Sequence, residues 1–345
     1  MALKSAPRTR SGAVPLRTYR SAGRPAAIAG VGSCVPPRVV TNADLEKIVE
    51  TSDQWIRERT GIERRRVADD GTPTFELATA AAREALADAG VQPEDLDMIL
   101  VSTSSPDGPF PSVACRVQEQ LGVPGCAAVD MLAACSGFVY GLSAAEAYIA
   151  SGRADTVLVI GAEVLSRLVD WTDRGTCVLF SDGAGAVVLR PAERGGGFLS
   201  WCLGADGRGY EQITCGDAPR GAYAAGDAAP KIGMRGPDVF KFAADIFIRQ
   251  AYAVAEAAGM AASDIDLWVP HQANGRIIEA AARRIGLPME RVVVTIQDYG
   301  NNSTATIPLA LRRAMDEQRI ETGDKVLLAG FGSGLTWGAC LLEWD

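Results

Sequence analysis

Two stretches of the chain carry the same alternation of apolar and polar positions. The first, FELATAAAREALADAGVQPEDLDMILVSTS, begins at Phe75, and the second, FAADIFIRQAYAVAEAAGMAASDIDLWVPHQ, begins at Phe242. In each, apolar residues recur with the period of a helix up to an Ala-Gly pair, and a short loop then leads into an apolar run. The pattern predicts a helix, a loop and a buried strand in each stretch.

The spacing between matching positions is constant. A separation of 169 positions is found for three pairs: Gly90 and Gly259, Asp97 and Asp266, and Val157 and Val326. The chain is therefore an internal duplication, with one half over residues 26–190 and the other over residues 197–345. Strands that alternate with helices predict an α/β fold with mostly parallel strands and helices covering the sheets. Residues 204–233 are Gly-rich and weakly periodic, and we predict that they form a flap beside the functional site.

Composition excludes several function classes. A net charge of −8 provides no basic excess to neutralise phosphates, so nucleic acid is not an expected partner. No apolar run reaches the length of a membrane span, so no membrane segment is expected. The 8 cysteines form no CxxC pair and the chain has 1 histidine, so we expect no metal site. We also expect reduced thiols and a cytoplasmic protein rather than a secreted disulfide framework.

The first 25 residues differ from the rest. They are rich in Arg, Ser and Pro, and no Asp or Glu occurs before Asp44. This composition predicts a basic, disordered extension over residues 1–25. The alternative is a transit peptide, which would place the protein in a plastid.

Candidate chemistry gathers where predicted strands end, which is where α/β sheets bind their ligands. His271, the only histidine, follows the strand LWV, although a lone histidine after an apolar run is also common in protein cores. Cys135 lies at the turn AACSGF between a strand and a helix, and Asn301 lies at the corresponding corner of the second half. A helix N-terminus lowers the pKa of a thiol, and a nearby neutral imidazole can take its proton. These residues predict a site with a cysteine nucleophile.

Six motifs resemble, in their order along the chain, those of the β-ketoacyl-[acyl carrier protein] synthase III family of the thiolase-like superfamily. They are TSDQWIRERTGIERRR, DMLAACSGF, DWTDRGT, VPHQAN, YGNN and FGSGLTWG, and the resemblance runs from about residue 26 to the C-terminus. It implies a duplicated thiolase-like fold of five layers, αβαβα, assembled as a homodimer. It also implies a condensing enzyme that initiates fatty-acid synthesis from an acyl-CoA, most simply acetyl-CoA, and malonyl-[acyl carrier protein]. No cofactor is implied, since CoA enters as the thioester substrate.

The resemblance assigns roles to the candidate residues. Cys135 is implied to be the nucleophile that takes the acyl group. His271 and Asn301 are implied to hydrogen-bond the malonyl thioester oxygen, where charge develops as carbon dioxide leaves. The backbone N–H groups of Cys135 and Ser333 are implied to form a second oxyanion hole.

Binding residues are implied in the same way. Trp55 and Arg174 resemble the pair that encloses the adenine of CoA, and Arg59 is similar to a phosphate contact beside it. The lining of the pantetheine tunnel is implied to include a further set: Gly236, Phe240 and Asn274.

Two surface features also match the family. Arg276 and Arg283 lie two turns apart on one predicted helix, with Arg284 beside them, which implies a docking face for an acidic carrier protein. A run of charge like this is equally typical of a solvated helix face. Phe110 resembles a residue that crosses the dimer into the partner's acyl pocket, where a bulky ring would favour short primers.

Departures from the family pattern leave alternatives open. Pro237 stands where the family often has Asn, NNST replaces Asn-Thr-Ser-Ala after Gly300, and Ser181 replaces a frequent Gly. A related enzyme with a longer or branched primer, or one that transfers acyl groups in polyketide metabolism, is one alternative. A non-catalytic binder of acyl carrier protein is another, and it predicts an unreactive Cys135. A dinucleotide-dependent enzyme is disfavoured, because AIAGVGSCV lacks the last glycine of a GxGxxG motif.

Overall fold

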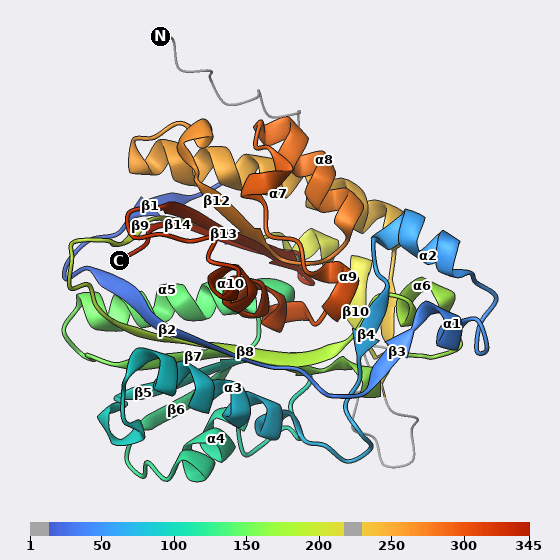
Figure 1. Cartoon of the computed structure of the whole chain (residues 1–345), viewed down its shortest axis with the longest axis horizontal. Helices are drawn as coiled ribbons and strands as arrows, with labels where there is room; N and C mark the ends of the chain where they lie inside the picture. The colour runs from blue at the N-terminus through green and yellow to red at the C-terminus, as the bar shows by residue number, and fades with distance from the viewer. Residues whose placement is uncertain (1–13, 217–229) are drawn as a thin grey trace.

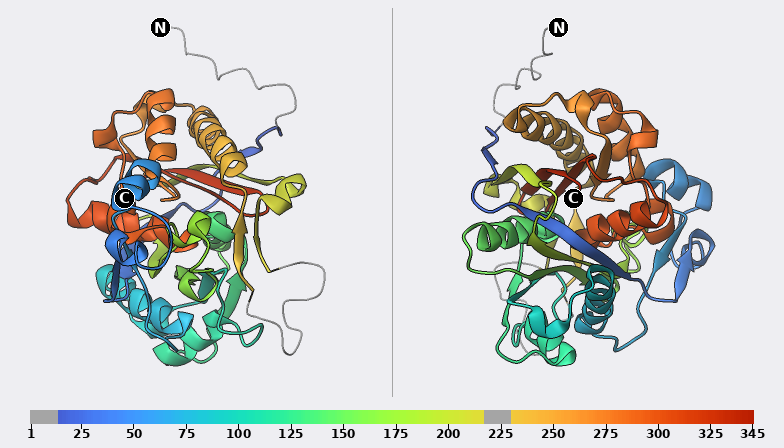
Figure 2. Two further views of the ribbon diagram at one scale, coloured as in Figure 1. Left: turned by 90° about the vertical axis from the view of Figure 1, so that its right-hand side faces the viewer. Right: turned by 60° about the vertical axis from the view of Figure 1, so that its left-hand side comes forward.

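The computed structural model describes residues 14–216 and 230–345 and arranges them in five layers (Figure 1). Helices α7 (Gly236–Ala258) and α8 (Gly275–Ile285) form one outer layer, and α3 (Thr74–Ala89) and α4 (Val113–Leu121) form the other. The central layer consists of α5 (Gly137–Ala150) and α10 (Thr306–Asp316), with a five-stranded sheet on either side of it. Figure 2 shows the same stacking from two other sides. The predicted αβαβα order is therefore confirmed.

Each sheet belongs mainly to one half of the duplication. The first has the order β2 (Ala26–Cys34), β8 (Asp182–Pro191), β7 (Val157–Val164), β5 (Met98–Ser102) and β6 (Ala127–Met131). The second has the order β1 (Thr18–Arg20), β9 (Gly197–Ala205), β14 (Thr336–Glu343), β13 (Lys325–Gly332) and β12 (Leu267–Pro270).

Strand directions correct the expectation of mostly parallel pairing. Only β5 with β6, β5 with β7, and β12 with β13 pair in parallel within these two sheets, and the other neighbours are antiparallel. A parallel neighbour needs a crossover connection of about a dozen residues or more. The turn of residues 333–335 between β13 and β14 is too short for one, so the last strands of each half return antiparallel.

The N-terminal segment also departs from its prediction. Strand β1 pairs antiparallel with β9, and the Trp201 indole N–H donates to Ser21 Oγ over 3.0 Å. The prediction of a disordered extension is therefore wrong for residues 18–20, because they cover what would otherwise be an open sheet edge at β9. Residues 1–13 of that prediction lie outside the described residues.

Smaller elements lie beside the layers, on the right in Figure 1. Strands β3 (Val39–Thr41) and β4 (Arg64–Arg66) form one antiparallel pair, and β10 (Ile213–Cys215) and β11 (Ile232–Met234) form another. The short helices are α1 (Asn42–Leu45), α2 (Asp53–Thr60), α6 (Arg174–Cys177) and α9 (Ile296–Tyr299). Strands β10 and β11 occupy part of the predicted flap, whose residues 217–229 lie outside the described part of the chain.

The duplication repeats a strained corner at the N-terminus of each central helix. A 3₁₀ turn, Ala134–Ser136, precedes α5, and a second, Ser303–Ala305, precedes α10, 169 positions later. Ala134 has φ 45° and Ser303 has φ 48°, a left-handed conformation that costs a residue with a side chain about 1–3 kcal/mol. The counterpart of Cys135 at this offset is Thr304.

Each corner packs against a glycine of the opposite half. A Cβ at Gly330 on β13 would lie 3.2 Å from the Cys135 carbonyl oxygen, and one at Gly161 on β7 would lie 2.5 Å from the Thr304 carbonyl oxygen. Gly161 and Gly330 are themselves 169 positions apart. The two halves therefore pack backbone against backbone where the corners meet.

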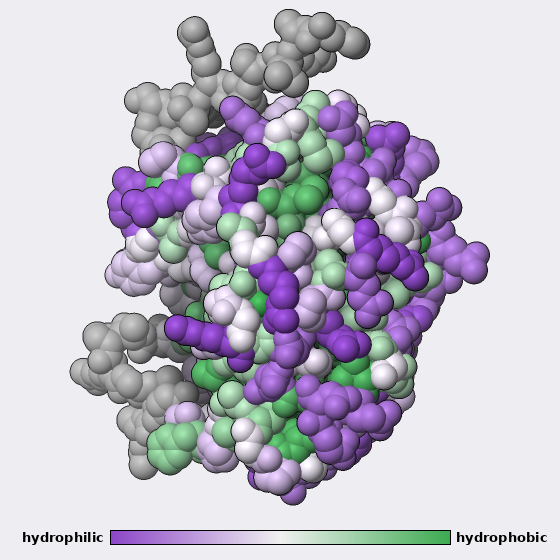
Figure 3. All heavy atoms as spheres, turned by 90° about the vertical axis from the view of Figure 1, so that its left-hand side faces the viewer, coloured by the Kyte–Doolittle hydropathy of each residue, from purple (hydrophilic) through white to green (hydrophobic). Residues whose placement is uncertain are grey.

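Most of the apolar surface is buried between the layers. The largest cluster fills the space between the two sheets and includes Phe138, Leu142, Ile307 and Leu328. Burying a side chain of this size stabilises the fold by about 1.5–3 kcal/mol. On the face shown in Figure 3, charged and polar residues surround small apolar patches. Among the described residues, no helix combines the length and the apolar character needed to cross a membrane.

Candidate active site

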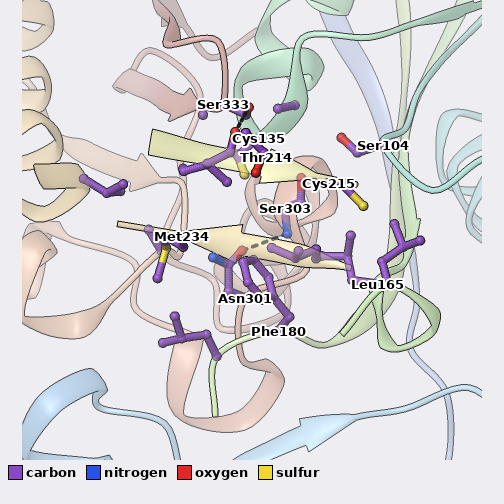
Figure 4. A pocket seen from close by; sticks show the side chains of 18 of the residues that line it. Ser104, Cys135, Leu165, Phe180, Thr214, Cys215, Met234, Asn301, Ser303 and Ser333 are labelled. Carbon is purple, nitrogen blue, oxygen red and sulfur yellow. Dashed lines mark hydrogen bonds between the residues drawn. The ribbon is translucent and has the colours of Figure 1, made fainter. Parts of the chain in front are cut away.

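Three of the predicted residues line one cavity of about 1280 Å³. Cys135 comes from the first half, and His271 and Asn301 come from the second. Figure 4 shows Cys135, Asn301 and Ser303 gathered around the same space. The cavity lies at the ends of β6 and β12, as expected for an α/β fold.

Cys135 lies in the 3₁₀ turn just before α5, with part of its surface open to the cavity. Desolvation raises the pKa of its thiol to about 12, against a smaller opposing effect of the Ser303 side chain. The expectation of a lowered pKa is therefore corrected, because the loss of water around the sulfur is the largest cause of the shift. The thiol is neutral near pH 7.

His271 follows β12 and is only 1% exposed. Its backbone N–H donates to the Ala329 carbonyl over 2.7 Å, and the Phe331 ring meets the imidazole edge-on, with centroids 5.5 Å apart. Nδ1 lies 2.6 Å from Thr306 Oγ1. Burial lowers the pKa of His271 to about 3, so the ring is neutral near pH 7.

Asn301 is fixed through its backbone and its side chain. Its N–H donates to the Leu179 carbonyl over 2.9 Å, and its carbonyl accepts from the Ser181 N–H over 3.0 Å. The side-chain Oδ1 accepts the Ser303 N–H over 2.9 Å. Because this bond identifies the oxygen end of the amide, the NH₂ group is the end left to donate to a ligand.

Ser181, one of the departures from the family pattern, has a structural explanation. Its hydroxyl donates to the Arg66 carbonyl over 2.8 Å and accepts the Arg66 N–H over 2.9 Å. These bonds attach the segment that holds Asn301 to strand β4. Ser181 therefore supports the site without entering the cavity lining.

Ser333 lies in the turn after β13, beside Cys135. Its hydroxyl donates to the Ile213 carbonyl over 2.6 Å, which leaves the backbone as the part of Ser333 available for an oxyanion. A Cβ at the preceding Gly332 would lie 2.6 Å from the Cys135 nitrogen. Only glycine at position 332 permits so close an approach of this turn to Cys135.

Glu163 is a buried acid near Cys135 that the sequence interpretation missed. It lies on β7 with no exposed surface, and its carboxylate accepts bonds from Ser105 Oγ over 2.6 Å and the Ser104 N–H over 3.0 Å. Burial raises the pKa of Glu163 to about 7. A single acid inside the apolar run TVLVIGAEVL is the signal that could have revealed it.

The predicted adenine and phosphate residues lie at one part of the cavity wall. Trp55, Arg59 and Arg174 all line it. The Arg174 guanidinium carbon lies 4.9 Å from the centroid of the Trp55 ring, and Arg174 also donates to the Glu50 carbonyl over 2.9 Å. This is a cation–π contact, so a planar base that entered between the two side chains would have to separate them.

The predicted tunnel residues also reach the cavity. Gly236 and Phe240 from α7 line it, together with Asn274, which caps α8. Asn274 accepts the Arg276 N–H over 2.9 Å and donates to the Arg59 carbonyl over 2.9 Å. Both ends of this amide are therefore engaged within the protein, and its evident role is to fix the start of α8.

Helix α8 carries the predicted docking arginines. Arg276, Arg283 and Arg284 are all exposed, and Arg276 also lies over the Phe240 ring, 5.8 Å from its centroid. Arg276 is thus the one of the three that also lines the cavity.

Phe110 is 84% exposed and does not line the cavity of its own chain. Nearby residues do: the segment from Pro106 to Pro109 forms part of the cavity wall. No group of three or more His, Cys, Asp or Glu side chains within the described ranges could hold a metal ion.

The comparisons with known proteins agree with each other. A model of 3-oxoacyl-[acyl-carrier-protein] synthase III matches residues 129–207, and the model of its C-terminal part matches residues 255–344. The chain is 50% identical over 319 residues to the beta-ketoacyl-[acyl-carrier-protein] synthase III of Bacillus pumilus, covering 92% of this chain and 99% of the relative. The corresponding protein of Geobacillus kaustophilus is 49% identical with the same coverage.

Solved structures are also similar. The 3-oxoacyl-[acyl-carrier-protein] synthase III of Aquifex aeolicus has a TM-score of 0.87 at 46% identity, covering 92% of this chain and all of the other. The priming β-ketosynthase of the R1128 polyketide pathway also has a TM-score of 0.87, at 33% identity over 97% of this chain and 99% of the other. Both enzymes share the fold described above over nearly their whole length.

Proposed function

The chain belongs to the β-ketoacyl-[acyl carrier protein] synthase III family, and on that premise we propose how its residues divide the reaction. The protein is an acyltransferase, a condensing enzyme that initiates fatty-acid synthesis. Its proposed substrates are an acyl-CoA and malonyl-[acyl carrier protein], and no cofactor takes part in the proposed reaction. The cavity that joins Trp55 and Arg174 to Cys135 supports this proposal.

The first half-reaction loads Cys135. The sulfur attacks the thioester carbonyl of the acyl-CoA, and the backbone N–H groups of Cys135 and Ser333 receive the developing oxyanion. The C–S bond to CoA then breaks. Since the Cys135 thiol is neutral at rest, its proton leaves to solvent as the sulfur attacks. A proton from solvent reaches the departing sulfur, so that free CoA thiol leaves and an acyl-enzyme remains.

The second half-reaction forms the carbon–carbon bond. Malonyl-[acyl carrier protein] loses carbon dioxide, and the electron pair of the broken bond becomes an enolate. The enolate oxygen accepts hydrogen bonds from His271 and from the Asn301 NH₂ group. The enolate carbon attacks the acyl group on Cys135, the sulfur leaves, and 3-oxoacyl-[acyl carrier protein] is released. A proton from solvent restores the thiol.

The observation that carries this division is the fixed amide of Asn301. Because its Oδ1 accepts the Ser303 N–H, the end that remains for a ligand is a donor, as an enolate requires. We expect His271→Ala and Asn301→Ala each to slow malonyl decarboxylation by about 10²–10³, the usual cost of one oxyanion donor. Acylation of Cys135 should change much less.

Single-turnover assays of each half-reaction measure this separation. Cys135→Ala is the matched control, since it should abolish acylation and condensation while leaving some decarboxylation. An equal loss of acylation in all three variants would refute the division of roles.

Mass spectrometry of the Cys135 peptide, after mixing with acetyl-, propionyl-, isobutyryl- and octanoyl-CoA, identifies the primer. Acetyl is the expected group, whereas a larger group would keep the mechanism and favour a specialised pathway. No acylation by any donor would favour the non-catalytic binder.

We also propose a homodimer. Strand β6 lies at an edge of its sheet, and two apolar side chains near that edge, Val129 and Leu132, are 42% and 78% exposed. Phe110, 84% exposed, adds a ring to the same set of unburied apolar residues. Covering such residues is the usual role of an obligate interface. Light scattering behind size exclusion should give twice the chain mass of 36.3 kDa, and a monomer would contradict the proposal.

The remaining proposals concern the carrier protein and the cell. The exposed Arg283 and Arg284 support docking of an acidic carrier protein on α8, because opposite charges steer association. A cytoplasmic location is proposed from the bacterial sources of the relatives, all named as synthases of this family. Cell fractionation with an antibody to the chain tests that location.

A further inference from the structure

The inner side of His271 has one close hydrogen-bonding partner in the described part of the chain. Nδ1 lies 2.6 Å from Oγ1 of Thr306, a residue that opens α10 and is 1% exposed. The same hydroxyl lies 2.9 Å from the Ser303 carbonyl oxygen. Thr306 therefore has one hydroxyl proton and two groups that could accept it.

The Ser303 carbonyl oxygen and His271 Nδ1 differ in whether they have another hydrogen-bond donor besides Thr306. The Ser303 carbonyl already accepts the backbone N–H of Thr306 at the end of its 3₁₀ turn. An unprotonated Nδ1, in contrast, has the Thr306 hydroxyl as its sole close donor within the described residues. Sending the proton to Nδ1 therefore leaves neither buried acceptor unpaired.

The proposed function selects between two arrangements. A ring that carried its proton at Nδ1 would donate to Oγ1, and the Thr306 hydroxyl would then donate to the Ser303 carbonyl. A ring that donates to the enolate oxygen from Nε2 has instead a lone pair at Nδ1, 2.6 Å from Oγ1. In that arrangement Thr306 is the donor and Nδ1 the acceptor.

This assignment fixes where the ring carries its own proton. Burial keeps the imidazole neutral, and a neutral imidazole has one N–H. If Nδ1 accepts from Thr306, the N–H must be at Nε2, the nitrogen on the other side of the ring. That is the tautomer an enolate oxygen requires, and it has no lone pair at Nε2 to take a thiol proton.

We propose that Thr306 is a positioning residue that holds His271 as the Nε2–H tautomer and so commits it to donating in the condensation step. The inference rests on the proposed function, which needs a donor at this position. It also explains why acylation should tolerate loss of His271: in this tautomer the ring cannot act as the base for Cys135.

The lone histidine makes a direct test available. Protein labelled with ¹⁵N-histidine gives the two ring nitrogens of His271 alone, and their chemical shifts and couplings identify the protonated one. In the unmodified enzyme near pH 7 we expect the proton at Nε2. A proton at Nδ1 would overturn the proposal. This measurement needs neither substrate nor turnover, so its result is separate from that of the proposed function.

Two variants provide the kinetic test. Thr306→Val keeps the shape and removes the donor, and Thr306→Ser keeps the hydroxyl and serves as the matched control. We expect Thr306→Val to lower the rate of malonyl decarboxylation by at least about tenfold, with acylation of Cys135 within about twofold of the unmodified enzyme. Thr306→Ser should retain the rate and the Nε2–H signal.

The results for the Thr306 variants distinguish a positioning role from a structural one. Equal decarboxylation by the Val and Ser variants, or an unchanged tautomer in Thr306→Val, would refute the role of Thr306. Equal loss in both half-reactions would indicate a structural defect and would also refute it. If the unmodified enzyme did not decarboxylate malonyl carrier protein at all, the proposed function would fail, while the spectrum would still report the tautomer.

Discussion

Replacing Glu163 by Gln should remove a large pH dependence of stability. In the folded protein, burial raises the pKa of this carboxyl from its ordinary value of 4.5 to about 7. The folded state therefore holds the proton more tightly than the unfolded chain. The contribution of this group to stability is complete below about pH 4.5, and it is lost as the pH rises through 7. Above pH 7, the folded protein must bury Glu163 as a charged carboxylate.

The magnitude follows from the size of the shift. A difference of about 2.5 pKa units at 1.36 kcal/mol each corresponds to about 3 kcal/mol. Because the side chain has no exposed surface, solvent screening does little to reduce this figure. The Gln side chain does not titrate, and any cost of its NH₂ group among Ser104 and Ser105 is the same at every pH.

Urea unfolding at fixed protein concentration, followed from pH 4.5 to pH 8.5, measures the effect. The free energy of unfolding of the unmodified protein, minus that of Glu163→Gln, should fall by about 3 kcal/mol across this range. Glu76→Gln is the control, since it removes an exposed carboxyl and should show a nearly constant difference. A constant difference for Glu163→Gln as well, or one that rises with pH, would refute the reasoning.

Two further predictions concern primer choice and carrier recognition. Phe110→Ala should raise the ratio of octanoyl to acetyl transfer to Cys135 by tenfold or more, because we propose that this ring fills the partner's acyl pocket. Competition between octanoyl-CoA and acetyl-CoA measures the ratio, and Tyr148→Ala is the control at another exposed aromatic residue. An unchanged ratio in Phe110→Ala would contradict the proposal. The double variant Arg283→Glu with Arg284→Glu should raise KM for malonyl carrier protein at least tenfold and leave acylation by acyl-CoA unchanged, because only docking is affected. Arg153→Glu is the control, because it reverses the charge of another exposed arginine. If KM for malonyl carrier protein were equal in the double variant and in the control, α8 would not be the docking face.

The family resemblance was sufficient to predict the five layers, and the sequence also indicated several residues that line the cavity. The constant offset of 169 positions predicted two similar halves, and the strand-to-helix corners predicted where Cys135 and Asn301 lie. The family resemblance then indicated residues that the structure finds along one cavity wall, Trp55 and Arg174 among them.

Other features depend on three-dimensional packing and could not be read from local patterns. Strand directions depend on connection lengths that motifs do not specify, and β1 forms because β9 offers it an edge. The pKa of Cys135 is raised because the fold removes water from the sulfur, whereas its position before a helix suggested the opposite. Thr306 contacts His271, which lies 35 positions away in the chain, so no local spacing rule could identify it.

The two glycines that receive the corners, Gly161 and Gly330, have a consequence for how the enzyme tolerates change. Cys135 belongs to one half, and His271 and Asn301 belong to the other, so the distance between them depends on how closely the two halves pack together. That distance is a property of the interface between the two repeated halves, where glycines allow the backbones to approach. Backbone contacts at Gly161 and Gly330 therefore set the spacing of the site. Even one added methyl group at either glycine would push the two halves apart.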